Sequence, residues 1–165
     1  MTPAAGEISA PAAAPAAAPA APADLDLVDG LVQLSFAVQS VLGRVANGLD
    51  LSVTQLRMLA VLEDREIGML QLASILELEK SSTTGLVDRA VRRGLVRRVA
   101  VPGNRRAVNV TVTPAGRKLV RTARRGVRAE ITAMSESLGE DQRDRLCSSI
   151  TTLVRRHAAS HAIPL

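Results

Sequence analysis

Hydrophobic residues between positions 24 and 50 recur at spacings of three and four, which is the period of an α-helix. The recurring positions are Leu27, Leu31, Leu34, Val38, Leu42 and Val45. They form one apolar stripe on a predicted helix that Gly48 ends. A stripe of this length needs a partner surface to cover it.

Two shorter helices are predicted next. Ser52 and Gln55 have the spacing of a capping box, so the first of them begins after Ser52. Its buried side is expected to hold Leu56, Leu59 and Leu62. After a break at Gly68, the second is expected to bury Leu72, Ala73 and Leu76.

A fourth helix is predicted from Lys80 to Arg93, between a break at Leu78-Glu79 and a stop at Gly94. Helical spacing puts four residues on its inner side: Thr83, Leu86, Val87 and Ala90. The other residues of its first turns are small and polar, so this end of the helix is expected to face solvent.

After residue 94, residues alternate between the two faces of the chain, as they do in β-strands. The runs "LVRRVAV" and "AVNVTVTP", separated by "PGNRR", predict a β-hairpin. Thr113 and Pro114 then predict the cap and first residue of a long helix. A last helix is predicted from about Glu140 to His161, with one face formed by Leu146, Ile150, Leu153 and His157. The predicted fold class is mainly α with a small β-hairpin wing.

Residues 1–23 follow neither pattern. They are mostly Ala and contain five of the eight prolines of the chain. Proline at about every fourth position prevents a helix and favours extended segments. We therefore predict a disordered tail, with a docking peptide as the alternative interpretation.

The distribution of charge indicates a polyanionic partner. The chain has a formal net charge of +5, and thirteen Arg or Lys lie between Arg89 and Ala129 without one acidic residue. A charge run is often only a solvated face. This run, however, spans two predicted helices and the hairpin. A nucleic acid is therefore the favoured partner.

The sequence also disfavours a location in a membrane or outside the cell. The apolar runs are too short to span a bilayer, and the N-terminus lacks the basic and leucine-rich regions of a signal peptide. The one cysteine, Cys147, fits a reducing compartment, so we expect a cytoplasmic protein. Buried packing is the favoured role of Cys147, and oxidant sensing is the alternative.

No arrangement of residues predicts an enzyme or a cofactor. The sequence shows no Ser-His-Asp set, glycine-rich phosphate loop or carboxylate cluster. The two histidines, His157 and His161, stand at i and i+4, which is a spacing that can chelate a metal. Without further ligands beside them, a role at an interface or helix end is favoured.

Two short helices, the second followed directly by a hairpin, are the order of a winged helix-turn-helix. The segments "LASILELEKSSTTGLVDRAVRRGLVRR" and "GNRRAVNVTVTPAGRKLV" resemble the MarR family of bacterial transcription regulators. The resemblance covers roughly residues 25–161. It implies a DNA-binding lobe at 51–113 and a helical dimerisation region at 24–50 and 114–161. We expect a ligand-responsive, homodimeric repressor of transcription that binds a pseudo-palindromic operator in double-stranded DNA. Activation stays open as the alternative, since the position of the operator relative to a promoter decides between the two.

The helix that begins at Lys80 is expected to enter the major groove end-first. Hydroxyl groups, one ammonium and free amides suit contacts with base edges and phosphates. The predicted contact residues of this helix are Lys80, Ser81, Ser82, Thr84, Gly85 and Arg89. A capping role for Ser81 and Ser82 stays open. Relatives often carry a longer side chain in place of Gly85, so DNA shape is expected to supply part of the preference.

The hairpin tip is expected to reach the minor groove through Arg105 and Arg106. In the family this tip usually reads Asp, any residue, Arg. Here Asn104 takes the place of the acid, so we expect a hydrogen bond instead of an ion pair and a more mobile wing. Contacts with phosphates are predicted for Arg92, Arg93, Arg97 and Arg98.

Many relatives bind a small aromatic or phenolic effector between the dimer helices and the DNA-binding lobe. In this chain aliphatic residues would have to line such a pocket. Two other classes of function stay open: an architectural or weakly specific DNA-binding protein, and a winged-helix module that binds a protein.

Overall fold

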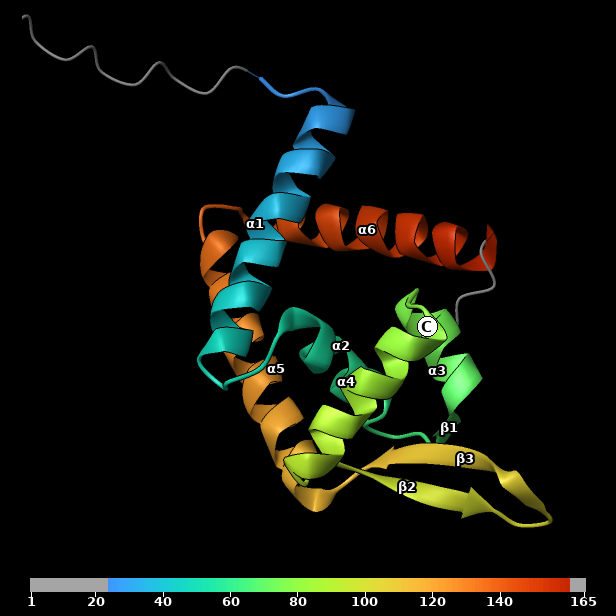
Figure 1. Ribbon diagram of the computed structural model, residues 1–165. Helices are drawn as coiled ribbons and strands as arrows, with labels where there is room; N and C mark the ends of the chain where they lie inside the picture. Colours follow the sequence, from blue (N-terminus) through green and yellow to red (C-terminus); the bar gives the residue numbers. More distant parts are fainter. Residues whose placement is uncertain (1–23, 161–165) are drawn as a thin grey trace, which may run out of the picture.

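The computed structural model describes residues 24–160, with the side chains at positions 105 and 106 left undescribed. The predicted tail at 1–23 and His161 lie outside the described residues. The elements are α1 (Leu27–Asn47), α2 (Val53–Val61), β1 (Ile67–Gly68), α3 (Met69–Leu76), α4 (Lys80–Arg92), β2 (Val96–Val101), β3 (Asn104–Val112), α5 (Pro114–Met134) and α6 (Glu140–Ser160). A lobe made of α2 to β3 lies below, while α1, α5 and α6 form a helical frame beside and above it (Figure 1).

The predicted helix starts are confirmed. The Ser52 hydroxyl accepts the Gln55 amide at 3.1 Å, and the Gln55 side chain accepts the Ser52 amide at 2.9 Å. Thr113 caps α5 by accepting the Gly116 amide at 3.1 Å, with Pro114 at the first helical position. These bonds satisfy amides that a helix leaves without intrahelical partners.

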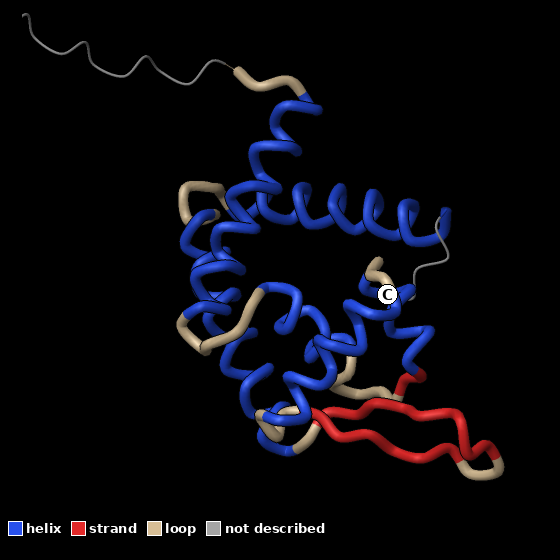
Figure 2. The backbone as a smooth tube through the Cα atoms, in the orientation of Figure 1, coloured by secondary structure: helices blue, strands red, loops and turns tan. Residues whose placement is uncertain are grey.

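The wing is a three-stranded antiparallel sheet in the order β1-β3-β2 (Figure 2). The predicted hairpin of β2 and β3 is confirmed, and β2 begins where Val96 pairs with Val112. The strand β1 was not predicted, because two residues are too short to show an alternating pattern. It pairs Ile67 with Val110 and so fixes the hairpin to the helices of the lobe.

The hydrophobic core lies inside the lobe. The residues predicted to be buried in α2 and α3 are buried, at 0–7% exposure, and so are Ile67, Val110 and Val112 of the sheet. The α5 helix closes the core with Val120 and Ala123. At Gly116 it approaches the backbone so closely that a Cβ atom would overlap the carbonyl oxygen of Leu95.

The helical frame, in contrast, has little core of its own. Leu27 and Leu31 of α1 are 75% and 45% exposed. Along α6 only Ala158 is buried. Cys147 is exposed, so the burial predicted for it is not found within the single chain. The apolar stripes of these helices are present as predicted, but this chain alone does not cover them.

Candidate DNA interface

The buried residues of α4 and its predicted DNA contacts lie on opposite sides of the helix. Thr83, Leu86, Val87 and Ala90 are at most 3% exposed and pack into the lobe. The outer side holds four exposed residues, Lys80, Ser81, Ser82 and Arg89. The inner residues therefore fix the orientation of the helix, and the predicted contact residues face away from the core.

The first turn of α4 keeps its polar groups available to a ligand. The helix is capped at Glu79, whose side chain makes no capping bond, and Ser81 and Ser82 lie inside the first turn. These serines consequently are not the N-cap. The Thr84 hydroxyl donates to the Lys80 carbonyl oxygen at 2.8 Å, which fixes the orientation of that side chain.

The wing projects from the lobe beside α4. Gly103 turns the chain at its tip with a φ of +79°, a conformation that glycine adopts without strain. Asn104 pairs with Val101 across the tip, and Arg105 and Arg106 follow it in β3. The backbone of the three predicted wing contacts is thus placed at the end of the hairpin.

The four arginines predicted to bind phosphate have different surroundings. Within the described part of the chain, the exposed side chains of Arg92 and Arg97 form no hydrogen bond or ion pair. The Arg93 guanidinium donates to the carbonyl oxygens of Leu49 and Asp50. Arg93 therefore ties α4 to the loop that precedes α2, a structural role that the sequence did not reveal.

The fourth arginine, Arg98, forms an ion pair with Asp88 of α4, and 2.7 Å separate Nη1 from Oδ1. Asp88 was not among the predicted site residues. No sequence signal marks this pair, because its partners lie on different elements and meet only when β2 packs against α4.

A groove of about 580 Å³ joins the recognition surfaces. It lies between α3, α4 and the wing strands, and its polar lining includes Lys80, Thr84, Arg98 and Asn109. Asn109 donates to the Glu66 carboxylate at 3.0 Å, which links β3 to the start of β1. The groove therefore brings three predicted contact residues together from α4 and β2.

The winged lobe was compared with models of known protein families. Residues 49–107 match the MarR family model, and they include α2, β1, α3, α4, β2 and the wing tip. The winged lobe is similar to the MarR family. No curated protein matches the sequence.

Solved structures extend the likeness of fold to the helical frame. RV1404 from Mycobacterium tuberculosis is 26% identical, with a TM-score of 0.69 over 82% of this chain and 97% of that one. CouR from Rhodococcus jostii RHA1, solved with p-coumaroyl-CoA, is 21% identical and has a TM-score of 0.62 over 78% and 91%. A MepR variant from S. aureus, solved with an oligodeoxyribonucleotide, is 16% identical and has a TM-score of 0.60 over 81% and 99%. The last two share the fold with this chain.

The described residues were also compared with the requirements of a membrane-spanning helix and of a metal site. In residues 24–160, no helix has the length and apolarity that crossing a membrane requires. Over the same residues, no three His, Cys, Asp or Glu side chains are grouped so that they could hold a metal ion.

Proposed function

We propose that this protein is a sequence-specific regulator of transcription that binds double-stranded DNA as a homodimer and represses from a pseudo-palindromic operator. The observation that carries the proposal is the division of α4. Its inner residues are locked in the core, and its polar first turn lies beside the wing. From Arg89 to Ala129 the chain carries thirteen cations and no acidic residue. This is the arrangement that a helix needs to read the major groove while a hairpin follows the backbone. The MepR variant has the same fold and was solved with an oligodeoxyribonucleotide, which supports the proposal that this chain binds DNA.

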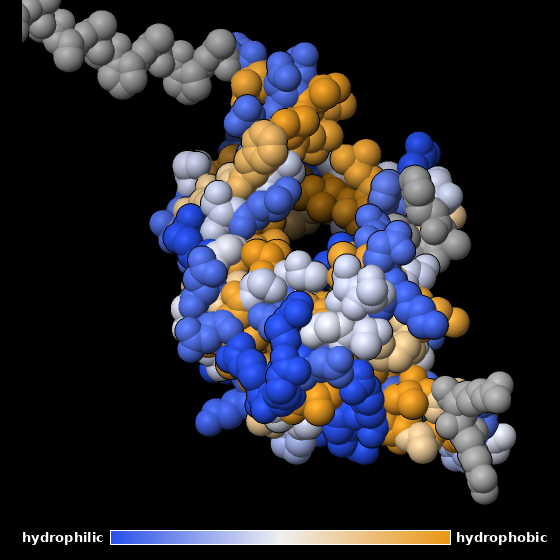
Figure 3. Space-filling view, viewed as in Figure 1, coloured by the Kyte–Doolittle hydropathy of each residue, from blue (hydrophilic) through white to orange (hydrophobic). Residues whose placement is uncertain are grey.

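The homodimer is supported by the apolar surface of the helical frame. A groove of about 590 Å³ lies between α1 and α6, and its lining is mostly aliphatic, with Ser35 and His157 as its polar members. It includes Leu31, Leu34, Val38, Ile150, Leu153 and Val154. Figure 3 shows apolar side chains along α1 and in the hollow beside α6. A second copy would bury both stripes, and each fully buried leucine stabilises an assembly by about 1.5–3 kcal/mol.

An effector site is proposed in a second cavity, which lies between α1, α2 and α5. Its volume is about 390 Å³, within the range of small-molecule pockets. Leu42, Leu56, Val120 and Val127 supply apolar walls. Arg128 supplies a positive charge, since Arg124, which also lines the cavity, is paired with Glu63. A small aromatic compound with an anionic group fits this lining. The CouR structure with p-coumaroyl-CoA supports an effector role in the fold.

The test is fluorescence anisotropy with two labelled duplexes near physiological salt. One carries the DNA upstream of the coding region of this protein, and the other carries the same bases in scrambled order. We expect the upstream duplex to bind about a thousandfold more tightly, the lower end for specific binders. Equal, salt-sensitive binding would indicate an architectural protein, and no binding to either duplex would indicate a module for a protein partner.

A further inference from the structure

The α5 helix carries a concentration of positive charge. Six cations lie between Pro114 and Ala129, and no acidic residue accompanies them before Glu130. They are Arg117, Lys118, Arg121, Arg124, Arg125 and Arg128. In α6, by comparison, acidic residues such as Asp141 and Asp144 alternate with the arginines.

Half of these cations already have a place in the fold. Arg117 donates to the Val112 carbonyl oxygen at 3.1 Å, and Arg124 pairs with the nearly buried carboxylate of Glu63. Arg128 lines the cavity between α1, α2 and α5. Arg117 and Arg124 thus have partners within the fold, and Arg128 belongs to the proposed effector site.

The other half, Lys118, Arg121 and Arg125, lies on one side of the helix and is called here the α5 basic face. Lys118, Arg121 and Arg125 are all exposed. Their spacings of three and four align them over about 10 Å of helix. Arg125 donates a 3.3 Å hydrogen bond to the Thr122 hydroxyl of the same helix. No carboxylate within residues 24–160 forms an ion pair with the α5 basic face.

Like charges at these spacings repel one another and destabilise a helix. A solvated helix face normally mixes both signs, as α6 does. An anionic partner would relieve the repulsion, because each bound anion neutralises a cation. The pattern therefore favours a polyanion with closely and regularly spaced charges.

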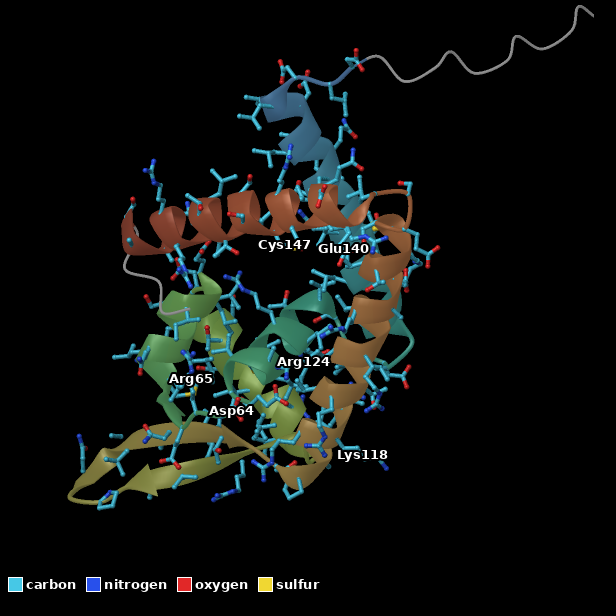
Figure 4. The ribbon with its side chains drawn as sticks, turned by 180° about the vertical axis from the view of Figure 1, so that it is seen from behind. Asp64, Arg65, Lys118, Arg124, Glu140 and Cys147 are labelled. Atoms are coloured by element: carbon cyan, nitrogen blue, oxygen red, sulfur yellow. The ribbon has the colours of Figure 1, made fainter. Side chains whose placement is uncertain are left out.

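The α5 basic face begins next to the proposed DNA interface. The Thr113 hydroxyl donates to the Gly94 carbonyl oxygen at 2.7 Å, which ties the start of α5 to the end of α4. Figure 4 shows Lys118 at the base of the wing, with Arg124 farther along α5. The exposed arginines Arg92 and Arg97 lie on either side of Gly94 in the sequence. Positive charge consequently continues from the end of α4 onto α5.

We infer that the α5 basic face binds the phosphate backbone of the same duplex that α4 and the wing hold. This inference rests on the proposed DNA-binding function and adds a surface outside the recognition helix and the wing. DNA carries one negative charge for about each 1.7 Å of its axis, so about 10 Å of helix spans enough phosphates for all three cations. Phosphate contacts carry no sequence information, so this surface raises affinity for every duplex alike.

The experiment compares two triple variants of the full chain. The test variant is K118Q/R121Q/R125Q, and the matched control is R145Q/R155Q/R156Q, which removes the same charge from exposed positions of α6. Anisotropy titrations at several salt concentrations give the slope of log K against log salt, on both the operator and the scrambled duplex. Circular dichroism and light scattering verify that each variant keeps its helix content and mass.

The test variant is expected to lower the magnitude of the slope by about 0.9 for each phosphate that the chain no longer binds, or about 2–3 per chain. The control should change the slope by less than about 1, and the ratio of operator to scrambled affinity should stay within about twofold of the wild type. Equal slopes for the test variant and the control would overturn the inference. The anionic partner of the α5 basic face would then be an acidic protein surface and not DNA.

Failure of the inference and failure of the proposed function give different results. A wild-type protein that binds both duplexes equally would contradict sequence-specific regulation. The slope comparison on the scrambled duplex would still decide whether the α5 basic face contacts phosphates. No binding of the wild type to any duplex would overturn both.

Discussion

Asp88 of the recognition helix and Arg98 of the first wing strand form an ion pair, with 2.7 Å between Oδ1 and Nη1. Each side chain is 39% exposed, so the pair contributes less than about 1 kcal/mol to folding. Its consequence is electrostatic. It places a carboxylate on the surface that is proposed to face DNA and occupies an arginine that would otherwise be available to a phosphate.

Substitution of Asp88 by Asn should therefore strengthen DNA binding. We expect the D88N variant to bind both the operator and the scrambled duplex about three- to tenfold more tightly at low salt, because Arg98 is released and one repulsive charge is removed. Anisotropy measures this change. Weaker binding would instead mean that the pair orients Arg98 toward its phosphate.

Arg93 and Arg92 are neighbours with different expected roles. Arg93→Gln removes donors from the Leu49 and Asp50 carbonyl oxygens and should lower the free energy of unfolding by about 1 kcal/mol. Arg92→Gln should leave the free energy of unfolding within about 0.5 kcal/mol of the wild type but weaken DNA binding. Urea denaturation and anisotropy on both variants separate the two effects. If Arg93→Gln leaves stability unchanged, its backbone bonds do not stabilise the fold.

Gly116 is expected to tolerate no side chain. In Gly116→Ala the new Cβ atom would overlap the Leu95 carbonyl oxygen and the Val112 side chain, so the free energy of unfolding should fall by about 1–3 kcal/mol. The matched control is Gly43→Ala in α1, where a Cβ atom meets nothing within 4 Å and should stabilise the helix by about 0.5–1 kcal/mol. Urea denaturation measures both variants. A change in the free energy of unfolding that has the same sign in both would contradict the prediction.

Replacement of both wing-tip arginines tests binding to the minor groove. The R105Q/R106Q variant should bind the operator more weakly and lower the salt slope by about 0.9 for each arginine that binds phosphate in the wild type. It should also show a weaker preference for A/T base pairs at the flanks, because a narrow minor groove attracts arginine. Binding to operators with A/T and G/C flanks measures this preference. A preference equal to that of the wild type would remove the wing from sequence recognition.

Leu153 tests the homodimer. The Leu153→Asp variant places a charge in the groove between α1 and α6 and should shift the protein from dimer to monomer in light scattering at micromolar concentration. Arg155→Asp, at an exposed position two residues away, is the control and should stay dimeric. If both variants keep the mass of a dimer, the subunits meet elsewhere.

The sequence was informative where a single segment determines its own structure. The capping box at Ser52, the cap at Thr113 and the inner side of α4 depend on spacing along one helix, and each was predicted correctly. The β1 strand, the ion pair of Asp88 with Arg98 and the bonds of Arg93 were not predicted. Each of these joins elements that are far apart in the chain, and their partners become visible only once the lobe is packed. Cys147 is exposed in the single chain, and its predicted burial beside the interface stripe stays a prediction that depends on the second copy.

The separation of inner and outer residues on α4 makes the helix suitable for retargeting. Because Thr83, Leu86, Val87 and Ala90 anchor it in the core, the outward positions can be randomised in a library while these four side chains stay in place. Gly85 widens the choice, since a Cβ atom there would meet the Arg89 side chain at an ordinary 3.5 Å. A longer side chain at this position would bring a new group toward a base edge, so selection from such a library should change the DNA sequence that the protein recognises while the scaffold stays the same.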